Sequence, residues 1–267
     1  MGKLEKLEEL NISKTAIEEI PPWIGSMKSL ISLDISGCKK LRVLPKEIGK
    51  LEELKELNID NTATEEIPPD IESMPELPSA ISKLFVHGCN KLKELPNLSS
   101  PKLLSQLNIK NCRELTEING LEALKFLVHL SVLGSKKLSK FDGLEHAESL
   151  RYLNMSSSLV NDDLVRGLDR LKNLEELDVS GCENLIRPDI SQLTHLKRLD
   201  AYHCHNIVEI KGLERLKTLE FLIIQSCTSI ETLPDLSCFN NLTYLEILGC
   251  SKLRDVQGLE KVGYVLK

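Results

Sequence analysis

The sequence predicts an α/β solenoid built from stacked repeats, and three observations support this prediction. A leucine frame recurs eleven times in the 267 residues, and a clear copy is L-x-x-L-x-I-x-x-C-x-x-L-x-x-L-P over 30–45. The second leucine of each copy returns at intervals of 22 to 27 residues. Seven of the eight cysteines take the same place in the frame. A fixed period of this size is the signature of a leucine-rich-repeat solenoid.

The core of each repeat is predicted to be a short strand whose side chains alternate between interior and surface. Leu33 and Ile35 are expected to point inward, and Asp34 outward. Stacked strands of this kind form a parallel sheet on the concave side of a curved horseshoe. The eleven strands are centred on Leu10, Leu33, Leu57, Leu84, Leu107, Leu130, Leu153, Leu177, Leu199, Leu222 and Leu245.

The convex side is predicted to consist mostly of irregular turns and short helices. PPWIGSMKSL over 21–30 and GLERLKTL over 212–219 are such segments, and their leucines should close the core. The longest interval separates Leu57 from Leu84 and is rich in proline, which removes backbone donors and blocks helix formation. We therefore expect an extended surface excursion there. Its prolines are Pro68, Pro69, Pro75 and Pro78.

The cysteines are predicted to form a structural ladder rather than a metal site or a set of disulfides. Thiols and hydroxyls are small donors, and an unpaired buried carbonyl of the adjacent repeat would cost about 1–3 kcal/mol. The sequence has no C-x-x-C pair, and His203 and His205 should point away from Cys204. The ladder position holds Cys38, Cys89, Cys112, Cys182, Cys204, Cys227 and Cys250, with Thr15, Thr62, Ser135 and Ser158 in the other copies.

A single leucine-rich-repeat domain over 1–267 is predicted, and we expect it to be a fragment without its terminal caps. The first strand starts close to Met1, and the last copy breaks off in its return segment at 258–264. No signal peptide is evident, and no apolar run approaches the ~18 residues of a membrane span. A cytoplasmic or nucleo-cytoplasmic location is expected, where the glycosylation sequons have no meaning. These sequons begin at Asn11, Asn97, Asn154 and Asn241.

No enzyme activity, cofactor or metal site is predicted. The sequence lacks the phosphate-loop, dinucleotide, zinc-protease and nucleophile-elbow motifs. Its acidic pairs, Glu18-Glu19, Glu52-Glu53 and Glu65-Glu66, are typical of a solvated face. Nucleic acid is not an expected partner, because the formal net charge is −6 and the basic residues are scattered.

The outward strand positions are therefore the candidate partner-binding surface. The first three repeats carry small, polar and acidic residues there, whereas the last three carry aromatic and apolar ones. Tyrosine and arginine are typical of interface hot spots, and an exposed apolar cluster usually marks a partner. The alternative is that these side chains pack on one another or on a missing domain. The main candidates are Arg198, Tyr202, Phe221, Ile223, Tyr244 and Leu248, and Phe85 with His87 forms a smaller second candidate.

Three segments resemble the leucine-rich-repeat region of plant intracellular immune receptors, the TIR-NBS-LRR disease resistance proteins. They are L-x-x-L-x-x-S-G-C-x-x-L over 174–185, T-x-I-E-E-I-P-P-x-I-G-x-x-x-x-L over 15–30 and T-L-P-D-L-S over 232–237. The resemblance implies recognition of a pathogen effector, or of a host protein that the effector modifies. It also implies autoinhibition through an adjacent nucleotide-binding domain. Neither that domain nor a TIR domain is present here, so their activities cannot be assigned.

Two alternatives stay open. E-I-P-P-x-I-G over 19–25 and L-P-K-E-I-G-K-L over 44–51 also resemble plant Ras-group repeat proteins, which are intracellular adaptors. The missing caps argue against such a free-standing scaffold. A secreted receptor ectodomain is the other alternative, and the reduced cysteine ladder and absent signal peptide argue against it.

Overall fold

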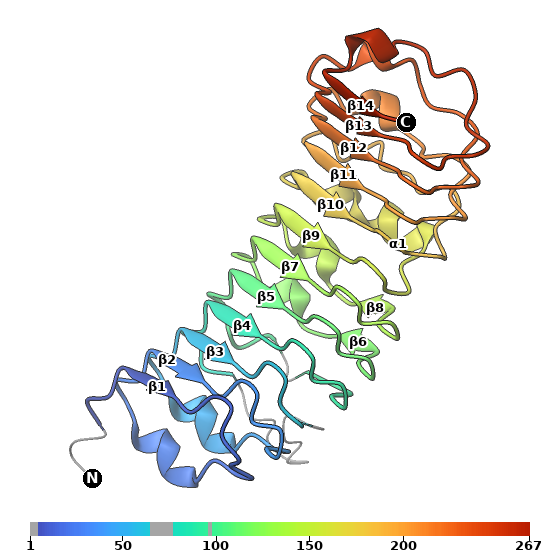
Figure 1. The fold of residues 1–267 in the computed structure, drawn as a ribbon. Coiled ribbons are helices and arrows are strands. Elements are labelled where there is room, and N and C mark those ends of the chain that lie inside the picture. Colours follow the sequence, from blue (N-terminus) through green and yellow to red (C-terminus); the bar gives the residue numbers. More distant parts are fainter. Residues whose placement is uncertain (1–4, 65–76, 96–97) are drawn as a thin grey trace. The chain divides into compact units, whose positions relative to one another are not determined.

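Each of the eleven copies of the leucine frame forms one short strand, as predicted. The computed structural model describes residues 5–64, 77–95 and 98–267 (Figure 1). The chain divides into two units, Met1–Ala147 (unit 1) and Glu148–Lys267 (unit 2). Within each unit, strands of successive repeats pair in parallel, and their central leucines lie opposite one another. The predicted repeat solenoid is confirmed.

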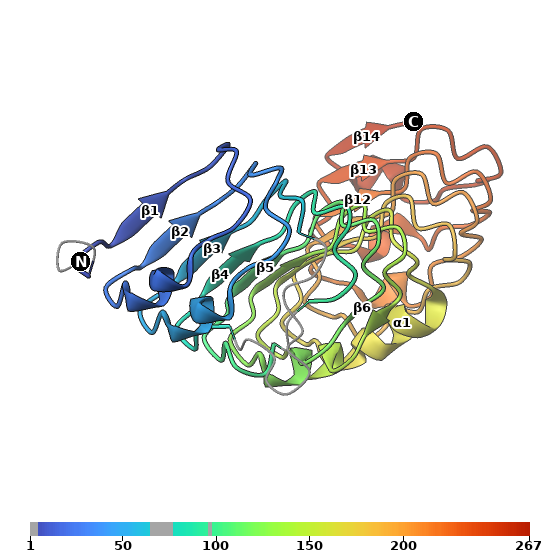
Figure 2. The ribbon, with the colours of Figure 1, turned by 90° about the horizontal axis from the view of Figure 1, so that it is seen from below.

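The sheet of unit 1 runs in sequence order, and β1 to β5 lie side by side in Figures 1 and 2. Its strands are β1 (Glu9–Asn11), β2 (Ser32–Asp34), β3 (Glu56–Asn58), β4 (Lys83–Phe85), β5 (Gln106–Asn108) and β7 (His129–Ser131). A second, two-stranded parallel sheet joins two return segments. It consists of β6 (Glu117–Ile118) and β8 (Lys140–Phe141), and the sequence patterns do not predict it.

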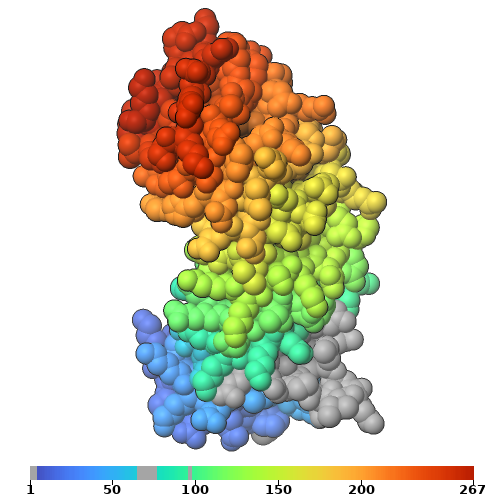
Figure 3. All heavy atoms as spheres, turned by 90° about the vertical axis from the view of Figure 1, so that its right-hand side faces the viewer, coloured from blue at the N-terminus to red at the C-terminus, as the bar shows by residue number. Residues whose placement is uncertain are grey.

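The sheet of unit 2 is also parallel and in sequence order. Its strands are β9 (Tyr152–Asn154), β10 (Glu176–Asp178), β11 (Arg198–Asp200), β12 (Phe221–Ile223), β13 (Tyr244–Glu246) and β14 (Tyr264–Leu266). In Figure 3 the atoms of successive repeats in this unit form adjoining bands. Each repeat is thus covered by its neighbours, which is how a solenoid gains stability.

The return segments contain short helices, as predicted. Most are single 3-10 turns, and one α-helix occurs among the described residues, α1 (Asp162–Gly167). Its first turn is capped by Asn161, whose side chain accepts a hydrogen bond from the Leu164 amide. The 3-10 helices are η1 (Pro22–Ser26), η2 (Lys46–Lys50), η3 (Leu121–Ala123), η4 (Leu144–His146), η5 (Leu168–Arg170), η6 (Leu213–Arg215), η7 (Leu236–Cys238) and η8 (Leu259–Lys261).

The core lies between the sheet and the return segments. Leu33 and Ile35 are fully buried, whereas Ser32 and Asp34 are partly exposed, which confirms the predicted alternation. Part of the proline-rich interval lies outside the described residues, including Pro68, Pro69 and Pro75, and so do Glu65, Glu66 and Asn97. Pro78 is described, and its carbonyl accepts a hydrogen bond from Ile81.

The chain after Gly258 differs from the prediction of a broken return segment. Helix η8 is followed by strand β14, which pairs with β13 so that Tyr264 lies opposite Tyr244. The leucine pattern missed this strand because Val262 and Val265 stand where the frame has its two leucines. Valine can replace leucine at these inward positions, since a β-branched side chain packs well in a strand.

The cysteine ladder has the predicted structure. The Cys227 thiol donates to the Ala201 carbonyl of the preceding repeat, with 3.1 Å between sulfur and oxygen. Burial raises the pKa of the Cys204 thiol to about 12 and raises that of Cys227 further, so both stay protonated donors. All seven ladder cysteines donate to a carbonyl of the preceding repeat, as does the hydroxyl of Ser135.

The other three hydroxyls at the ladder position differ from the prediction. Thr15, Thr62 and Ser158 donate to a carbonyl three residues earlier in their own repeat. The C–O bond is shorter than the C–S bond, so these hydroxyl oxygens lie nearer to the carbonyl of their own turn and bond it. The ladder between repeats is therefore a property of the cysteines and of Ser135.

The residue before each ladder position has a left-handed backbone in all eleven repeats. Glycine, which adopts this conformation without strain, occupies five of these positions. At Ser226 the φ angle is 61°. Six non-glycine residues share this strained position, namely Lys14, Asn61, Asn111, Ser157, His203 and Ser226.

Ser226→Gly is expected to raise the free energy of unfolding by about 0.5–1 kcal/mol, because it removes the cost of a left-handed L-residue. Urea unfolding followed by circular dichroism measures this change. The control is Ser251→Gly, which places the same substitution where φ is not positive and should lower stability. If both variants change the free energy of unfolding equally, the left-handed backbone at Ser226 does not cost stability.

Candidate functional site

The candidate surface in unit 2 is a row of side chains on the exposed face of its sheet. Arg198, Phe221, Tyr244 and Tyr264 lie side by side because their strands pair in register. The guanidinium carbon of Arg198 is 5.7 Å from the centre of the Phe221 ring. The ring centres of Phe221 and Tyr244 are 6.1 Å apart, and those of Tyr244 and Tyr264 are 5.3 Å apart and stacked. We call these four residues the stacked row.

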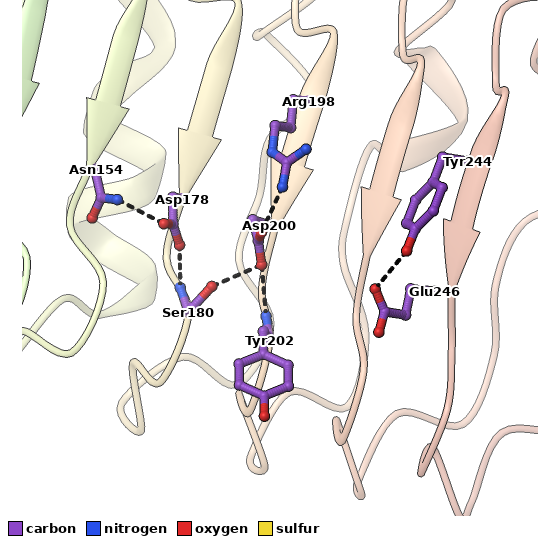
Figure 4. A network of polar contacts seen from close by, with 8 residues as sticks. All are labelled: Asn154, Asp178, Ser180, Arg198, Asp200, Tyr202, Tyr244 and Glu246. Carbon is purple, nitrogen blue, oxygen red and sulfur yellow. Dashed lines mark hydrogen bonds and ion pairs between the residues drawn. The ribbon is translucent and has the colours of Figure 1, made fainter. Parts of the chain in front are cut away.

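Carboxylates on the same strands hold two members of the stacked row. Arg198 Nη2 lies 3.1 Å from Asp200 Oδ2, two residues further along β11 (Figure 4). The Tyr244 hydroxyl donates to Glu246 Oε2 at 3.0 Å, again within one strand. This hydrogen bond raises the pKa of Tyr244, so its hydroxyl stays protonated. Stacking and polar contacts within the chain thus hold the row in place.

The neighbouring outward column has a structural role that the sequence patterns did not reveal. Asp178 Oδ1 accepts a hydrogen bond from the Ser180 amide, and Asp200 Oδ1 accepts from Tyr202 in the same way. Asn154 Nδ2 donates to Asp178 Oδ2 at 2.7 Å, and Ser180 Oγ donates to Asp200 Oδ1 at 2.8 Å (Figure 4). The Asn154, Asp178 and Asp200 side chains each accept from the backbone N–H two residues further on, which closes an Asx turn after the strand.

The same turn recurs in unit 1 at Asn11, Asp34 and Asn58. In unit 2, burial raises the pKa of Asp178, and the charge of Asp200 adds to this shift. These polar residues therefore hold the backbone rather than forming an open recognition surface.

The predicted binding residues of unit 2 fall into three groups. Arg198, Phe221 and Tyr244 belong to the stacked row. Tyr202 and Leu248 lie in the third outward column with 38% and 43% of their surface exposed. The Tyr202 ring packs edge-on against His203, with ring centres 4.0 Å apart.

Ile223 differs from the prediction, because only 8% of its surface is exposed. It lies between Asp200 and Glu246 in register, so side chains of adjacent strands flank it. Alternation places Ile223 on the outer face, but its neighbours shield it. Ile223 therefore packs against its neighbours on this face and is not part of the exposed apolar cluster that was expected.

Sequence reasoning missed Tyr264, which is 55% exposed and ends the stacked row. The available signal was the pattern V-x-x-V over 262–265, which stands 20 residues after the equivalent positions 242–245. A search for any aliphatic residue in the frame, and not only leucine, would have placed Tyr264 in the outward column.

The second candidate, Phe85 with His87, lies in unit 1. Phe85 ends β4 and is half-buried. His87 Nε2 is 3.1 Å from the side-chain nitrogen Nδ2 of Asn111, and the His87 backbone N–H donates to Asp60 Oδ1. Burial raises the pKa of Asp60. His87 is thus tied into its turn, and the two side chains form no row like that of unit 2.

The His203-Cys204-His205 segment separates as predicted. Cys204 is buried in the ladder, and its thiol donates to the Val179 carbonyl. His203 and His205 turn toward each other, with 3.3 Å between Nδ1 and Nε2. Across residues 5–64, 77–95 and 98–267, no group of three or more His, Cys, Asp or Glu side chains is arranged to hold a metal.

Comparisons with known proteins show what this chain resembles. A family model described as R13L1/DRL21 LRRs matches residues 2–62. The Arabidopsis thaliana protein SUPPRESSOR OF npr1-1, CONSTITUTIVE 1 is 27% identical over 249 residues, which cover 92% of this chain and 10% of that protein. Arabidopsis disease resistance protein RPS4B is 31% identical over 133 residues, covering 41% of this chain and 11% of that protein. The resemblance to plant disease resistance proteins is confirmed.

A third relative, Arabidopsis disease resistance protein RPP5, is 29% identical over 121 residues, covering 45% of this chain and 8% of that protein. The chain thus spans about a tenth of the length of the curated relatives it matches. The activities of those whole proteins are therefore not carried over to this chain.

Solved structures show the same fold. YopM from Yersinia enterocolitica WA-314 superposes with a TM-score of 0.62 and 23% identity, covering 96% of this chain and 50% of that chain. An internalin, inlF, from Listeria monocytogenes superposes with a TM-score of 0.57 and 18% identity, covering 99% of this chain and 88% of that chain. The leucine-rich-repeat fold is normally a protein-interaction scaffold. In the described part of the chain, no helix is long and apolar enough to cross a membrane.

Proposed function

We propose that this chain is a protein-recognition module of a plant immune receptor, and that the exposed sheet face of unit 2 binds the partner. The partner is a pathogen effector or a host protein that an effector modifies. The same chain contributes to autoinhibition by contacting an adjacent nucleotide-binding domain. Such a receptor works in the cytoplasm, or in the cytoplasm and nucleus. The similarity to resistance proteins supports the class, and the stacked row supports the place.

The observation that carries this proposal is the ordered stack that ends in exposed Tyr264, with exposed Tyr202 and Leu248 nearby in the third column. Aromatic and arginine side chains supply most of the energy in hot spots. Side chains already held by stacking lose less conformational entropy when a partner binds. A row of this kind is therefore suited to binding and is not needed to close the core.

A Tyr202, Phe221 and Tyr244 triple alanine variant is expected to lose its partner in pull-downs from plant extract. Truncation of each hot-spot side chain should weaken binding by about 1–3 kcal/mol. Circular dichroism must first show that the triple variant is folded. The matched control is Phe126→Ala, which removes an exposed aromatic side chain from unit 1.

Loss of a partner only in the triple variant would support the proposal. If the folded triple variant retains every partner, the face is a packing surface for other domains and the proposal is wrong. If the Phe126→Ala control loses the same partner, the sheet face of unit 2 is not the specific binding site and the proposal is also wrong.

A further inference from the structure

We propose that His203 and His205 form a binding site for a divalent transition-metal ion, and that zinc is the ion that fits it best. The two side chains lie on the turn after β11 and face each other across the buried Cys204. Nδ1 of His203 and Nε2 of His205 would bind the ion, and its two other positions would be open. The site is independent of the proposed function and holds whether or not the sheet face binds a partner.

The distance between the two ring nitrogens fits a zinc ion. His203 Nδ1 and His205 Nε2 are 3.3 Å apart. Two nitrogen ligands at about 2.0–2.1 Å from a tetrahedral zinc ion are separated by about 3.3 Å. A square-planar ion such as copper(II) would bring the same two atoms to about 2.9 Å. The observed separation therefore favours tetrahedral coordination.

His205 is oriented as a ligand by its other ring nitrogen. Its Nδ1 lies 2.8 Å from the carbonyl oxygen of Ser226 in the next repeat. A carbonyl can only accept a hydrogen bond, so Nδ1 carries the ring proton and Nε2 keeps its lone pair. Metal-binding histidines generally donate their second ring N–H to a carbonyl or a carboxylate in this way. Nε2 of His205 is thus free of a proton on the side that faces His203.

His203 can supply the second ligand without a change of charge. Its Nδ1–H donates to His205 Nε2 when no metal is bound. When zinc binds, the proton of Nδ1 is exchanged through water for one on Nε2 of the same ring, and Nδ1 gains a lone pair. This exchange changes the tautomer of the ring and leaves its charge unaltered. The backbone is held in place throughout, because the His203 N–H donates to the Gln225 carbonyl at 2.9 Å.

His203 is also the exception in its column of left-handed residues. The other five non-glycine residues each precede a glycine in the next repeat, and their side chains come within 3.3 Å of the place that a Cβ of that glycine would take. These pairs are Lys14–Gly37, Asn61–Gly88, Asn111–Gly134, Ser157–Gly181 and Ser226–Gly249. His203 precedes Ser226 instead, and its ring turns toward His205. Backbone strain without this packing role is typical of functional positions.

Cys204 is not a ligand of the proposed site, although it lies between the two histidines in the sequence. Its thiol is buried and donates to the Val179 carbonyl at 3.1 Å, on the inner side of the turn. Within residues 5–64, 77–95 and 98–267, no third His, Cys, Asp or Glu completes a metal-binding group. The two open positions on the ion are therefore left to water or to side chains of another protein.

The test is isothermal titration calorimetry of the full chain, purified without a histidine tag and kept reduced, with zinc chloride. We expect zinc to bind and magnesium, which prefers oxygen ligands, not to bind. His203→Gly and His205→Ala should each weaken zinc binding at least about tenfold, since loss of an outer-shell partner alone costs about 10- to 100-fold. His203→Gly should fold, because glycine suits the φ of 58° at this position.

Two control variants separate this site from other ligands of zinc. His195→Ala removes an exposed histidine of the same unit, and Cys238→Ala removes the half-buried thiol outside the ladder. Neither should weaken zinc binding. Nitrogen NMR of the imidazole rings gives a direct assignment, and zinc should shift Nδ1 of His203 together with Nε2 of His205.

Three results would overturn the proposal. The first is that the parent chain binds no zinc, and the second is that folded His203→Gly and His205→Ala bind zinc as tightly as the parent chain. The third is that His195→Ala or Cys238→Ala loses zinc binding as strongly as His205→Ala, which would place the ion elsewhere.

Discussion

Cys227→Leu is expected to lower the free energy of unfolding by about 3 kcal/mol. Cys227 is fully buried, and its thiol donates to the Ala201 carbonyl. Leucine is larger, and overpacking of a filled core costs about 1–3 kcal/mol. Leucine also has no donor, so the Ala201 carbonyl loses its partner at a further cost of about 1–3 kcal/mol. Urea unfolding followed by circular dichroism measures the change.

The control is Cys227→Ser, which keeps a donor of smaller size. Ser135 shows that a hydroxyl can do this, since its oxygen lies 3.1 Å from the Ile109 carbonyl of the preceding repeat. We expect Cys227→Ser to cost less than about 1 kcal/mol. If Cys227→Leu unfolds at the same urea concentration as the parent, the thiol at this position is not a structural donor.

Gly212→Ala is expected to destabilise the chain by about 3 kcal/mol, for two reasons that add. Gly212 has a φ of +79°, where an L-residue costs about 1–2 kcal/mol. A Cβ at this position would also lie 2.3 Å from the Cα of Ser191, so the backbone of a neighbouring repeat would have to move. Thermal and urea unfolding of the purified variant measure the loss.

The matched control is Gly167→Ala in the same unit. Gly167 has a φ of −63°, and a Cβ there would meet nothing within 4 Å. Alanine should therefore leave stability unchanged or raise it by about 0.5–1 kcal/mol. If the two variants lose stability equally, the close approach of Gly212 to Ser191 does not hold in solution.

The repeat architecture could be predicted because a single physical requirement restricts the residue type at each position of the frame. Leu33 and Ile35 must be inward for a repeat to be covered by its neighbours, and the ladder position must be small and able to donate. Strand β14 was missed because valines replace its leucines. The pairing of β6 with β8 was missed because two residues per strand are too few to show a periodic pattern.

The candidate site could be predicted only in part. Alternation placed Arg198, Phe221 and Tyr244 on the outer face, and all three lie there in the structure. The burial of Ile223 depends on the side chains of adjacent strands, which alternation along one strand does not describe. Asp200 accepts a hydrogen bond from the Tyr202 backbone N–H, and this bond depends on the backbone geometry after the strand. The sequence pattern therefore could not show that the Asp200 carboxylate already has a partner within the chain.

Site-specific photocrosslinking tests the central claim most directly. Two versions of the chain would carry p-benzoylphenylalanine, one in place of Tyr202 in unit 2 and one in place of Phe126, an exposed residue before β7 in unit 1. Both would be irradiated in plant extract, and the crosslinked protein identified by mass spectrometry. Recognition on the sheet face of unit 2 predicts a partner crosslinked from position 202 and not from position 126. The same partner captured from position 126 alone, or equally from both, would contradict the account.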